Sequence, residues 1–195
     1  MERLALMMEP RDEARIIEAC QQGDRIAFQQ LFESHKDRVY SIALHHSGNE
    51  ATAGDVTQQV FMKLFKSIGQ FRGGSEFTTW LYRIVVNACT DEQRKRRRFV
   101  PLTDAVEVTR MVARGSQEES HIKRQTADSV REAIAGLTPK LRMPILLKYV
   151  EDLSYEEIAE VLGCSMGTVA SRLNRGHKAL ARKLAHLRGT DPAGE

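Results

Sequence analysis

Apolar residues with helical spacing in the stretch Phe71–Arg98 constrain the fold of this 195-residue chain most strongly. They recur at steps of three and four residues: Phe77, Trp80, Leu81, Ile84, Val85 and Ala88. This spacing aligns them along one face of an α-helix. Ser75 follows a glycine-rich turn, and serine is a residue type that caps helices by accepting from the free amides of the first turn. The stretch therefore predicts an amphipathic helix.

The opposite side of this predicted helix is polar, and its end is basic. The polar residues Thr79, Arg83, Asn87 and Thr90 lie about one turn apart, and the helix ends in Arg94, Lys95, Arg96, Arg97 and Arg98. Cations near the C-terminus stabilise a helix because that end of the helix dipole is negative, but five in a row are more than this effect requires. This pattern favours a helix that lies against a polyanion. The alternative is a solvated helix end, with Trp80 packed in the core.

Helical periodicity also accounts for the residues before this stretch. We expect helices over about residues 12–22, from Asp24 to a break at 47–49, and over about 50–68. The last of these has an apolar side with Val56, Val60, Phe61, Leu64, Phe65 and Ile68, and a polar side with Asp55, Gln58, Gln59 and Lys63. No segment shows the alternation of a strand, so the predicted fold class is all-α.

The periodicity fails between residues 99 and 124, where proline, glycine and small polar residues accumulate. About two dozen residues without a helical pattern are too many for an ordinary connection inside one compact domain. The sequence therefore predicts a linker that joins two small helical domains.

Beyond the linker the start signals of helices are clear. We expect a helix over about 125–135, a second that begins at Thr138-Pro139, and a third that begins with the capping box Ser154–Glu157. The second helix turns Leu141, Ile145, Leu146 and Tyr149 toward the core. A last helix from about Gly167 has an apolar stripe, Val169, Leu173, Gly176, Leu180, Leu184 and Leu187, opposite Ser171, Asn174, Arg175, Lys178 and Arg182.

The last two helices differ in the sign of their charge. Six basic residues and no acid occur between Cys164 and Arg188, whereas five acids and no base occur between Glu151 and Glu160. A capped helix, a glycine turn and a basic helix form a helix-turn-helix, whose second helix enters the major groove of DNA. The alternative is a helical hairpin with a charged exposed side, but the complete separation of charge favours DNA binding.

Other functional classes find little support in the residues. The three cysteines lie far apart, and neither they nor the adjacent His45-His46 pair have metal-ligand spacing. No apolar run approaches the roughly 20 residues that span a bilayer, and the N-terminus lacks the layout of a signal peptide. We therefore expect reduced thiols, no metal or other cofactor, no membrane insertion and a cytoplasmic location.

At this point the chain resembles the extracytoplasmic-function (ECF) sigma factors, small bacterial promoter-recognition subunits of RNA polymerase. The matching motifs are DVTQQVFMKLFKSIGQFRGGSEFTTWLYRIVVN at 55–87 and LSYEEIAEVLGCSMGTVASRLNRGHKAL at 153–180. The resemblance extends from Asp12 to Leu187. Two motifs in the right order, joined by a linker, are far more specific than either alone.

The resemblance implies a sigma-two domain at 12–98 and a sigma-four domain at 125–188, with the linker at 99–124 and tails at 1–11 and 189–195. It implies as partners core polymerase, through its beta-prime clamp helices and beta flap, promoter DNA, and an anti-sigma factor. The polymerase would supply the chemistry, so the chain itself would not be an enzyme. The linker would thread toward the active-site cleft of the polymerase.

The resemblance also assigns residues to these partners. Polymerase would be bound by Asp55, Gln58, Gln59 and Lys63. The minus-ten element would be contacted by Phe71, Ser75, Arg83, Asn87, Arg94, Lys95, Arg96, Arg97 and Arg98. The minus-thirty-five element would be contacted by Thr168, Ser171, Arg172, Asn174, Arg175, Lys178 and Arg182.

One departure concerns Ala170, where the family often has a basic residue. Its absence removes a contact near the start of the reading helix, so the minus-thirty-five sequence is not inferred. Two other functions stay open at this stage. One is a stand-alone helix-turn-helix regulator, and the other is a sigma-like decoy that binds polymerase or an anti-sigma factor without reading a promoter. The basic faces argue against the decoy, and an enzyme is a weaker third alternative.

Overall fold

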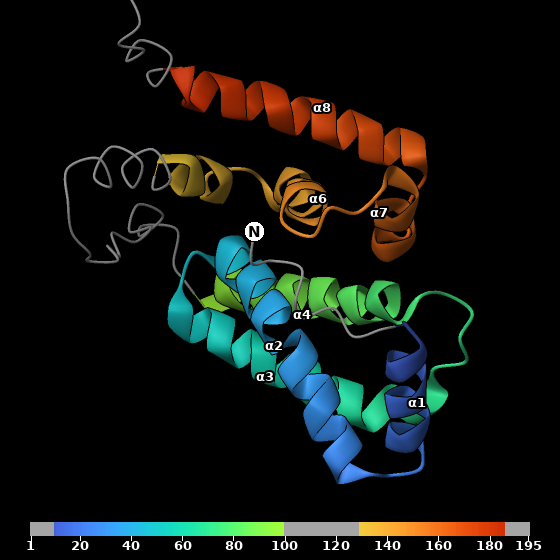
Figure 1. The fold of residues 1–195 in the computed structure, drawn as a ribbon. Coiled ribbons are helices and arrows are strands. Elements are labelled where there is room, and N and C mark those ends of the chain that lie inside the picture. Colours follow the sequence, from blue (N-terminus) through green and yellow to red (C-terminus); the bar gives the residue numbers. More distant parts are fainter. Residues whose placement is uncertain (1–9, 100–128, 186–195) are drawn as a thin grey trace, which may run out of the picture. The chain divides into compact units, whose positions relative to one another are not determined.

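The computed structural model describes residues 10–99 and 129–185 (Figure 1). Within these ranges the backbone forms helices joined by turns, without a strand, and this confirms the predicted all-α fold class. The chain divides into two compact units, and each is described by itself. The first contains helix α1, most of α2, and helices α3 and α4. The second contains α6, α7 and α8.

The helices of the first unit are close to those that the sequence predicts. They are α1 (Pro10–Gln21), α2 (Arg25–Ser47), α3 (Glu50–Ser67), the short 3-10 helix η1 (Ile68–Gln70) and α4 (Phe77–Phe99). Gly23 has a φ of 88° where α1 ends, a left-handed conformation that glycine adopts without steric cost. The carboxylate Oδ1 of Asp24 then accepts from the N–H groups of Ile26 at 2.7 Å and Ala27 at 3.2 Å. Asp24 is therefore the cap of α2, as predicted.

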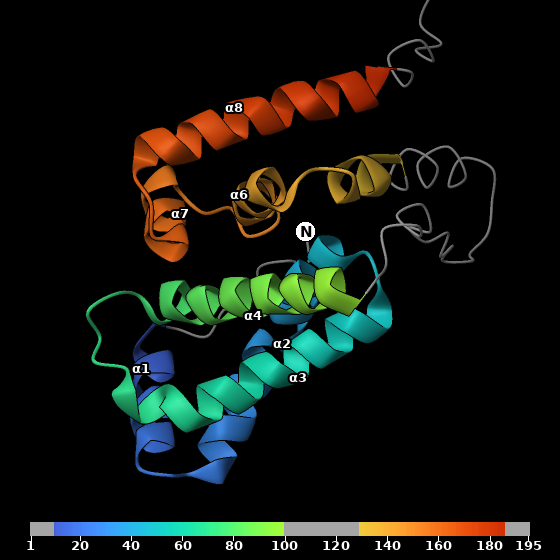
Figure 2. The same ribbon diagram turned by 180° about the vertical axis from the view of Figure 1, so that it is seen from behind.

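Aliphatic side chains from three helices form the core of the first unit. Leu31, Val39 and Ile42 of α2, Val56, Val60 and Leu64 of α3, and Leu81 and Val85 of α4 are at most 1% exposed. Full burial of one such side chain stabilises the fold by about 1.5–3 kcal/mol. In Figure 2 helix α4 crosses in front of α2, and α3 lies beside α4 and packs against it.

The second unit is described from residue 129. Residues 129–135 are helical, and α6 (Pro139–Tyr149), α7 (Tyr155–Leu162) and α8 (Met166–Lys183) follow. Thr138 is the residue before α6, as predicted. Its backbone carbonyl accepts from the N–H groups of Leu141 and Arg142, both at 2.9 Å, but its side chain makes no capping hydrogen bond.

A capping box fixes the start of α7. The N–H of Glu157 donates to Ser154 Oγ at 3.1 Å, and the N–H of Ser154 donates to Glu157 Oε2 at 2.7 Å. Two amides of the helix start are thereby satisfied reciprocally. Gly163 ends α7 with a φ of 61°, and Ser165 Oγ accepts from the N–H of Thr168 at the start of α8. The helix-turn-helix predicted from the sequence is present.

Two large side chains that the sequence assigns to the core lie at the surface. Phe65 of α3 is 54% exposed and Tyr149 of α6 is 63% exposed. Both lie on the edge of an apolar stripe, where the neighbouring helix covers one side of the ring only. Phe65 packs edge-on against Phe28, with ring centroids 5.0 Å apart, and leaves its other side open.

Helix α4 buries a wider face than its apolar stripe predicts. Thr79, assigned to the polar side, is 2% exposed, and Tyr82 and Cys89 are also buried. The buried arc is wider because α4 contacts both α3 and the His35 ring of α2. The helix begins at Phe77, and its first backbone bond runs from the N–H of Trp80 to the carbonyl of Glu76. Glu76, and not Ser75, is therefore the residue before the helix.

The predicted tails and linker fall mostly on residues that the structure does not describe. Pro10 and Arg11, placed in the N-terminal tail, belong to α1, and Phe99 belongs to α4. The rest of the 99–124 linker, the 189–195 tail and Leu187 lie outside the described residues.

Helices α6 and α8 approach closely at Gly176, which is buried in the middle of α8. A methyl group added there would lie 3.0 Å from Ile145 Cγ1 and 3.2 Å from its Cδ1. Ile145 is itself buried and surrounded by core side chains, so it has little room to move. Glycine at this position therefore permits the close packing of the two helices.

We expect Gly176→Ala to destabilise the second unit by about 1–3 kcal/mol, since overpacking outweighs the better helix propensity of alanine. Gly167→Ala in the same helix is the matched control, because an added methyl there would meet only Ser165 Oγ, at 3.9 Å. Urea unfolding of both variants, followed by circular dichroism, measures the difference. A Gly176→Ala protein as stable as the Gly167→Ala protein would contradict the packing argument.

Candidate nucleic-acid and polymerase interfaces

The polar face predicted for the last helix is exposed in α8. Val169, Leu173 and Gly176 are buried in the second unit, and the side chains on the other face are exposed: Ser171, Asn174, Arg175, Lys178 and Arg182. The sequence of α8 contains no acidic residue. This helix therefore presents an amide and several cations on one continuous surface. Such a surface can donate to phosphates and to base edges.

Two further residues assigned to the minus-thirty-five element lie at the edge of this surface of α8. Thr168 is half-buried, and its hydroxyl is 3.0 Å from that of Ser165. Arg172 is also half-buried, and its Nη1 donates toward Cys164 Sγ at 3.8 Å. The structure thus brings Asn174, Arg175 and Lys178 together at the surface, with Arg172 turned partly toward the preceding turn.

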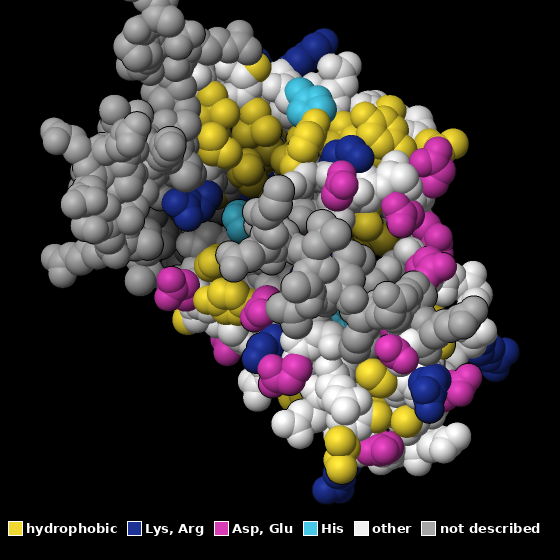
Figure 3. Space-filling view, in the orientation of Figure 1, with side chains coloured by type: hydrophobic (Ala, Val, Ile, Leu, Met, Phe, Trp, Pro, Cys, Tyr) yellow, Lys and Arg dark blue, Asp and Glu magenta, His cyan; other side chains and the backbone are white. Residues whose placement is uncertain are grey.

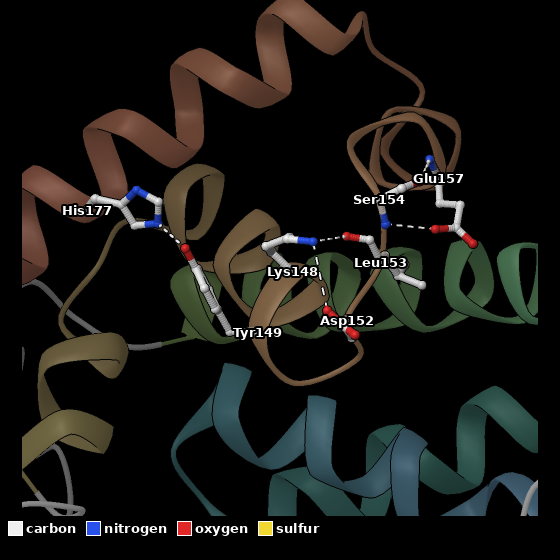
Figure 4. Close-up of polar contacts among 7 residues, drawn as sticks. All are labelled: Lys148, Tyr149, Asp152, Leu153, Ser154, Glu157 and His177. Atoms are coloured by element: carbon white, nitrogen blue, oxygen red, sulfur yellow. Dashed lines mark hydrogen bonds and ion pairs between the residues drawn. The ribbon is translucent and has the colours of Figure 1, made fainter.

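Polar contacts connect α6 with α8 and with the turn that leads into α7 (Figure 4). The hydroxyl of Tyr149 lies 2.9 Å from Nε2 of His177 in α8, and the two rings meet edge-on. Lys148 Nζ donates to the carbonyl of Leu153 at 3.0 Å and lies 3.9 Å from the carboxylate of Asp152. These contacts span the turn between α6 and α7, where Asp152 has a φ of 56°. The exposed Tyr149 therefore has a partner in α8.

Acidic side chains gather over α7 in the second unit (Figure 3). Glu156 and Glu160 of this helix are exposed, and Glu157 is half-buried in the capping box. The charge separation seen in the sequence is thus a separation between two neighbouring helices. A nucleic acid is attracted by the surface of α8 and repelled by that of α7.

In the first unit, Arg83 and Asn87 of α4 are exposed one turn apart. The half-buried loop residue Phe71 lies before this helix, with its ring centroid 5.3 Å from that of Trp80 and 5.6 Å from that of Phe77. Trp80 is half-buried in this aromatic cluster, in agreement with its interpretation as a packing residue. Ser75 is half-buried in the same loop.

The basic end of α4 is partly paired with acids. Asp91 lies 3.7 Å from Lys63 Nζ of α3 and 3.8 Å from Arg94 Nη1, and Lys95 lies 3.9 Å from Glu92. Arg96 is exposed. Arg97 and Arg98 belong to the last turns of α4, and their side chains are outside the described residues. Ion pairs between exposed groups contribute only about 0–1 kcal/mol, so these cations can exchange partners.

An aromatic groove between α2 and α3 is the main surface feature that the sequence did not predict. Its volume is about 550 Å³, and its lining includes Phe28, Phe32, Tyr40, Phe61, Met62 and Phe65. Met62 is 53% exposed at its edge. Gln58, predicted to bind polymerase, also lines the groove. One sequence feature could have indicated the groove. The apolar Met62 lies beside the polar side of α3, close to Phe65 at the edge of the apolar stripe of that helix.

The other predicted polymerase-binding residues lie beside this groove on α3. Asp55 and Lys63 are exposed and Gln59 is half-buried. The spacing 55, 59, 63 places them on one face of the helix, adjacent to the face that carries Gln58 and Met62. The structure thus brings all four predicted residues onto two neighbouring faces of α3.

The buried thiols of the first unit are unsuited to chemistry. Burial raises the pKa of Cys89 to about 12, and burial followed by the charge of Asp24 raises the pKa of Cys20. Both thiols therefore stay protonated at neutral pH. In the part of the chain that the structure describes, no group of His, Cys, Asp or Glu side chains could hold a metal ion. None of the described helices is long and apolar enough to cross a membrane.

Two family models match the chain. The model of Sigma-70 region 2 matches residues 31–99, and that of Sigma-70 region 4 matches residues 127–180. The first match contains the loop, α4 and the groove lining apart from Phe28, and the second contains most of the helix-turn-helix.

Known proteins resemble the chain over nearly its whole length. The ECF RNA polymerase sigma factor SigW of Bacillus subtilis is 32% identical over 88% of this chain and 96% of its own length. The ECF sigma-E factor of Escherichia coli K12 is 33% identical over 93% and 98%. The sigma factor RpoE of Bartonella quintana, solved with the anti-sigma factor NepR, has a TM-score of 0.67, 27% identity, and covers 81% of this chain and 96% of its own.

The two region models match the two units in chain order, and the two relatives align over 88% and 93% of the chain. The protein belongs to the ECF family of RNA polymerase sigma factors.

Proposed function

We propose that the two units of this sigma factor divide promoter recognition between them. The first unit binds the polymerase clamp and the unpaired minus-ten strand, and the second reads the minus-thirty-five duplex. The observation that carries this proposal is the pair of exposed polar faces, Arg83 with Asn87 on α4 and Asn174 to Lys178 on α8. The corresponding domain boundaries are 12–98 and 125–188.

For the minus-thirty-five element, α8 enters the major groove with its N-terminal half. Ser171, Asn174 and Arg175 lie where a recognition helix reaches base edges. Lys178 and Arg182, one and two turns further on, contact phosphates and set the position of the helix. Thr168 and the half-buried Arg172 support the edge of this surface, and Ala170 adds no polar contact to it.

For the minus-ten element, an unstacked base lies between the loop and α4. Phe71 provides a ring face, Ser75 a hydroxyl and Asn87 an amide. Trp80, at the edge of the apolar stripe, and Asn87, at the edge of the polar face, are seven residues apart, hence two turns and about 10 Å along the boundary of the two faces of α4. Since Phe71 packs on Trp80, the loop and Asn87 flank the same stretch of helix surface. Arg83 and the basic residues 94–98 hold the phosphates of the strand.

For polymerase, the groove between α2 and α3 and the polar residues of α3 form one binding surface. Aromatic side chains and Met, exposed in a hollow with polar residues on its rim, have the composition of a protein–protein contact. We assign the beta-prime clamp helices to this surface, with Asp55, Gln59 and Lys63 at its edge. The beta flap is assigned to the second unit.

We also propose an anti-sigma factor as a regulatory partner, which acts in the cytoplasm where the promoters are. The related RpoE of Bartonella quintana was solved in complex with an anti-sigma factor. The chain itself contributes binding and no catalytic group, since the polymerase forms the phosphodiester bonds. The comparisons favour this function over a stand-alone regulator. Run-off transcription with core polymerase on a library of genomic promoters tests it and names the promoter.

Asn87 of α4 is expected to act in promoter opening. The Asn87→Ala variant should bind core polymerase normally but open duplex promoters about 5- to 100-fold more slowly, because a base-specific contact is worth about 1–3 kcal/mol. A template mismatched over the minus-ten element should recover part of the rate, because its unpairing cost is already removed. Permanganate reactivity of unpaired thymines measures opening.

Thr90→Ala is the control for Asn87, since the Thr90 hydroxyl bonds to the carbonyl of Val86 within α4. It should open promoters at the wild-type rate. Unchanged opening and unchanged minus-ten preference in Asn87→Ala would show that Asn87 is only a solvated surface residue.

In α8, substitutions of Arg175 and Lys178 should separate base reading from phosphate contact. Arg175→Ala should lower the preference for the correct minus-thirty-five sequence, by about 1–3 kcal/mol per lost base contact. Lys178→Ala should weaken binding to all sequences alike and make the salt dependence less steep. Binding of holoenzyme to matched and scrambled promoters at several salt concentrations distinguishes the two. Equal losses of preference in both variants would refute this division.

The groove between α2 and α3 is expected to contribute to polymerase binding. Phe65→Ala should weaken core binding by about 1–3 kcal/mol, as expected for an aromatic side chain at the centre of an interface. Asp55→Ala combined with Gln59→Ala should also weaken it. The control is Ile26→Ala, because Ile26 is 70% exposed on α2 but lines a different hollow beside α1. Fluorescence titration of core polymerase measures each affinity, and equal affinities for all three proteins would remove the groove from the interface.

A further inference from the structure

Gln21, the last residue of α1, holds the start of the loop that leads into α4. Its side-chain Nε2 donates to the carbonyl of Phe71 at 2.8 Å and to that of Ile68 at 3.2 Å. The two acceptors lie 50 and 47 residues further along the chain. In both Figure 1 and Figure 2 the connection between α3 and α4 passes beside α1.

The two carbonyls belong to the point where regular structure ends. The carbonyl of Ile68 also accepts from the N–H of Phe71 at 3.1 Å, which closes the 3-10 turn. After Phe71 the chain has no helical structure until Phe77, and Gly73 turns it with a φ of 68°. The Gln21 amide thus bonds the carbonyl of the first residue of η1 and that of its C-cap, Phe71, the last position before the loop.

Helix α1 is a firm support for this contact. Ile17, one turn before Gln21, and Cys20, the residue directly before it, are both buried in the first unit. Glu13 Oε1 lies 3.1 Å from Nε2 of the buried His35 of α2. The N–H of Asp24 donates to the carbonyl of Ala19 at 3.1 Å, so the end of α1 is also closed. A side chain on such a support can fix the position of a loop.

We propose that Gln21 is a positioning residue for promoter opening, which fixes the backbone of Phe71 so that its ring stands ready for the unstacked minus-ten base. The proposal rests on the assignment of the Phe71 loop and Asn87 to the minus-ten strand. It extends the DNA-opening apparatus to α1, which precedes the residues 31–99 matched by the region 2 model. A loop that is already ordered loses less conformational freedom when it captures a base.

Trp80 provides a test that needs no polymerase. It is the only tryptophan of the chain, and its ring packs on that of Phe71. If Gln21 holds Phe71 in place, Gln21→Ala should expose Trp80 to quenching by acrylamide in the full-length protein. Gln21→Met keeps the length and apolar stem of the side chain without its donor, and should have the same effect. Gln22→Ala, at the exposed neighbouring position, is the control.

The functional test uses holoenzyme on a promoter mapped with the wild-type protein. Both Gln21 variants should slow opening by about three- to tenfold, the range expected for loss of the hydrogen bond that holds Phe71. They should also discriminate less between the correct and a substituted minus-ten base, a change that a merely structural role would not cause. Core affinity and binding through the minus-thirty-five element should stay at the wild-type level.

Each outcome decides one point. Unchanged Trp80 quenching in both Gln21 variants would overturn the positioning role. Increased quenching with wild-type opening and base discrimination would show that the contact holds the loop without serving DNA, and would overturn the proposal. If the wild-type protein initiates transcription but Asn87→Ala and the Gln21 variants are all normal, the minus-ten assignment itself fails. Normal Gln21 variants beside a defective Asn87→Ala refute the Gln21 proposal alone.

Discussion

Burial of the aliphatic stripes is the interaction on which the rest of each unit depends. Once Leu81 and Val85 of α4 are inside, the helical period turns Arg83 and Asn87 outward. In the same way, burial of Val169 and Leu173 turns Asn174 and Arg175 of α8 outward. The outward orientation of these side chains is therefore a consequence of core packing, and polar contacts such as Tyr149–His177 refine it.

The features that could be predicted from the sequence are those decided over a few residues. Asp24 caps α2 and Ser154 pairs with Glu157 because each of these contacts spans three residues or fewer. The exposed face of α8 follows from its period alone. For the same reason the fold class and the helix-turn-helix were predicted correctly, while the roles of individual residues at DNA and polymerase stay predictions.

The features that could not be predicted depend on which third element covers a helix. Thr79 is buried because α4 packs against more than one neighbour, and Phe65 is exposed because α2 covers only one side of its ring. The groove between α2 and α3 and the contact of Gln21 with Phe71 arise only when segments far apart in sequence meet. Periodicity contains no information on such meetings.

The ion pairs at the end of α4 bear on how the basic run can act. Lys63 and Arg94 both lie near Asp91, so the surface charge there is lower than the sequence count suggests. All three side chains are at least half exposed, and water screens their attraction. A DNA phosphate can therefore take Arg94 from Asp91 at little cost, because the exposed pair, 3.8 Å apart, is longer than a hydrogen bond and contributes little. Since Lys63 belongs to α3, to which we assign polymerase binding, Asp91 lies between the proposed polymerase and DNA surfaces. If Arg94 moved to a phosphate, Asp91 would keep Lys63 as its partner. The ammonium group of Lys63 on α3 would then be held more firmly by Asp91 when DNA is bound.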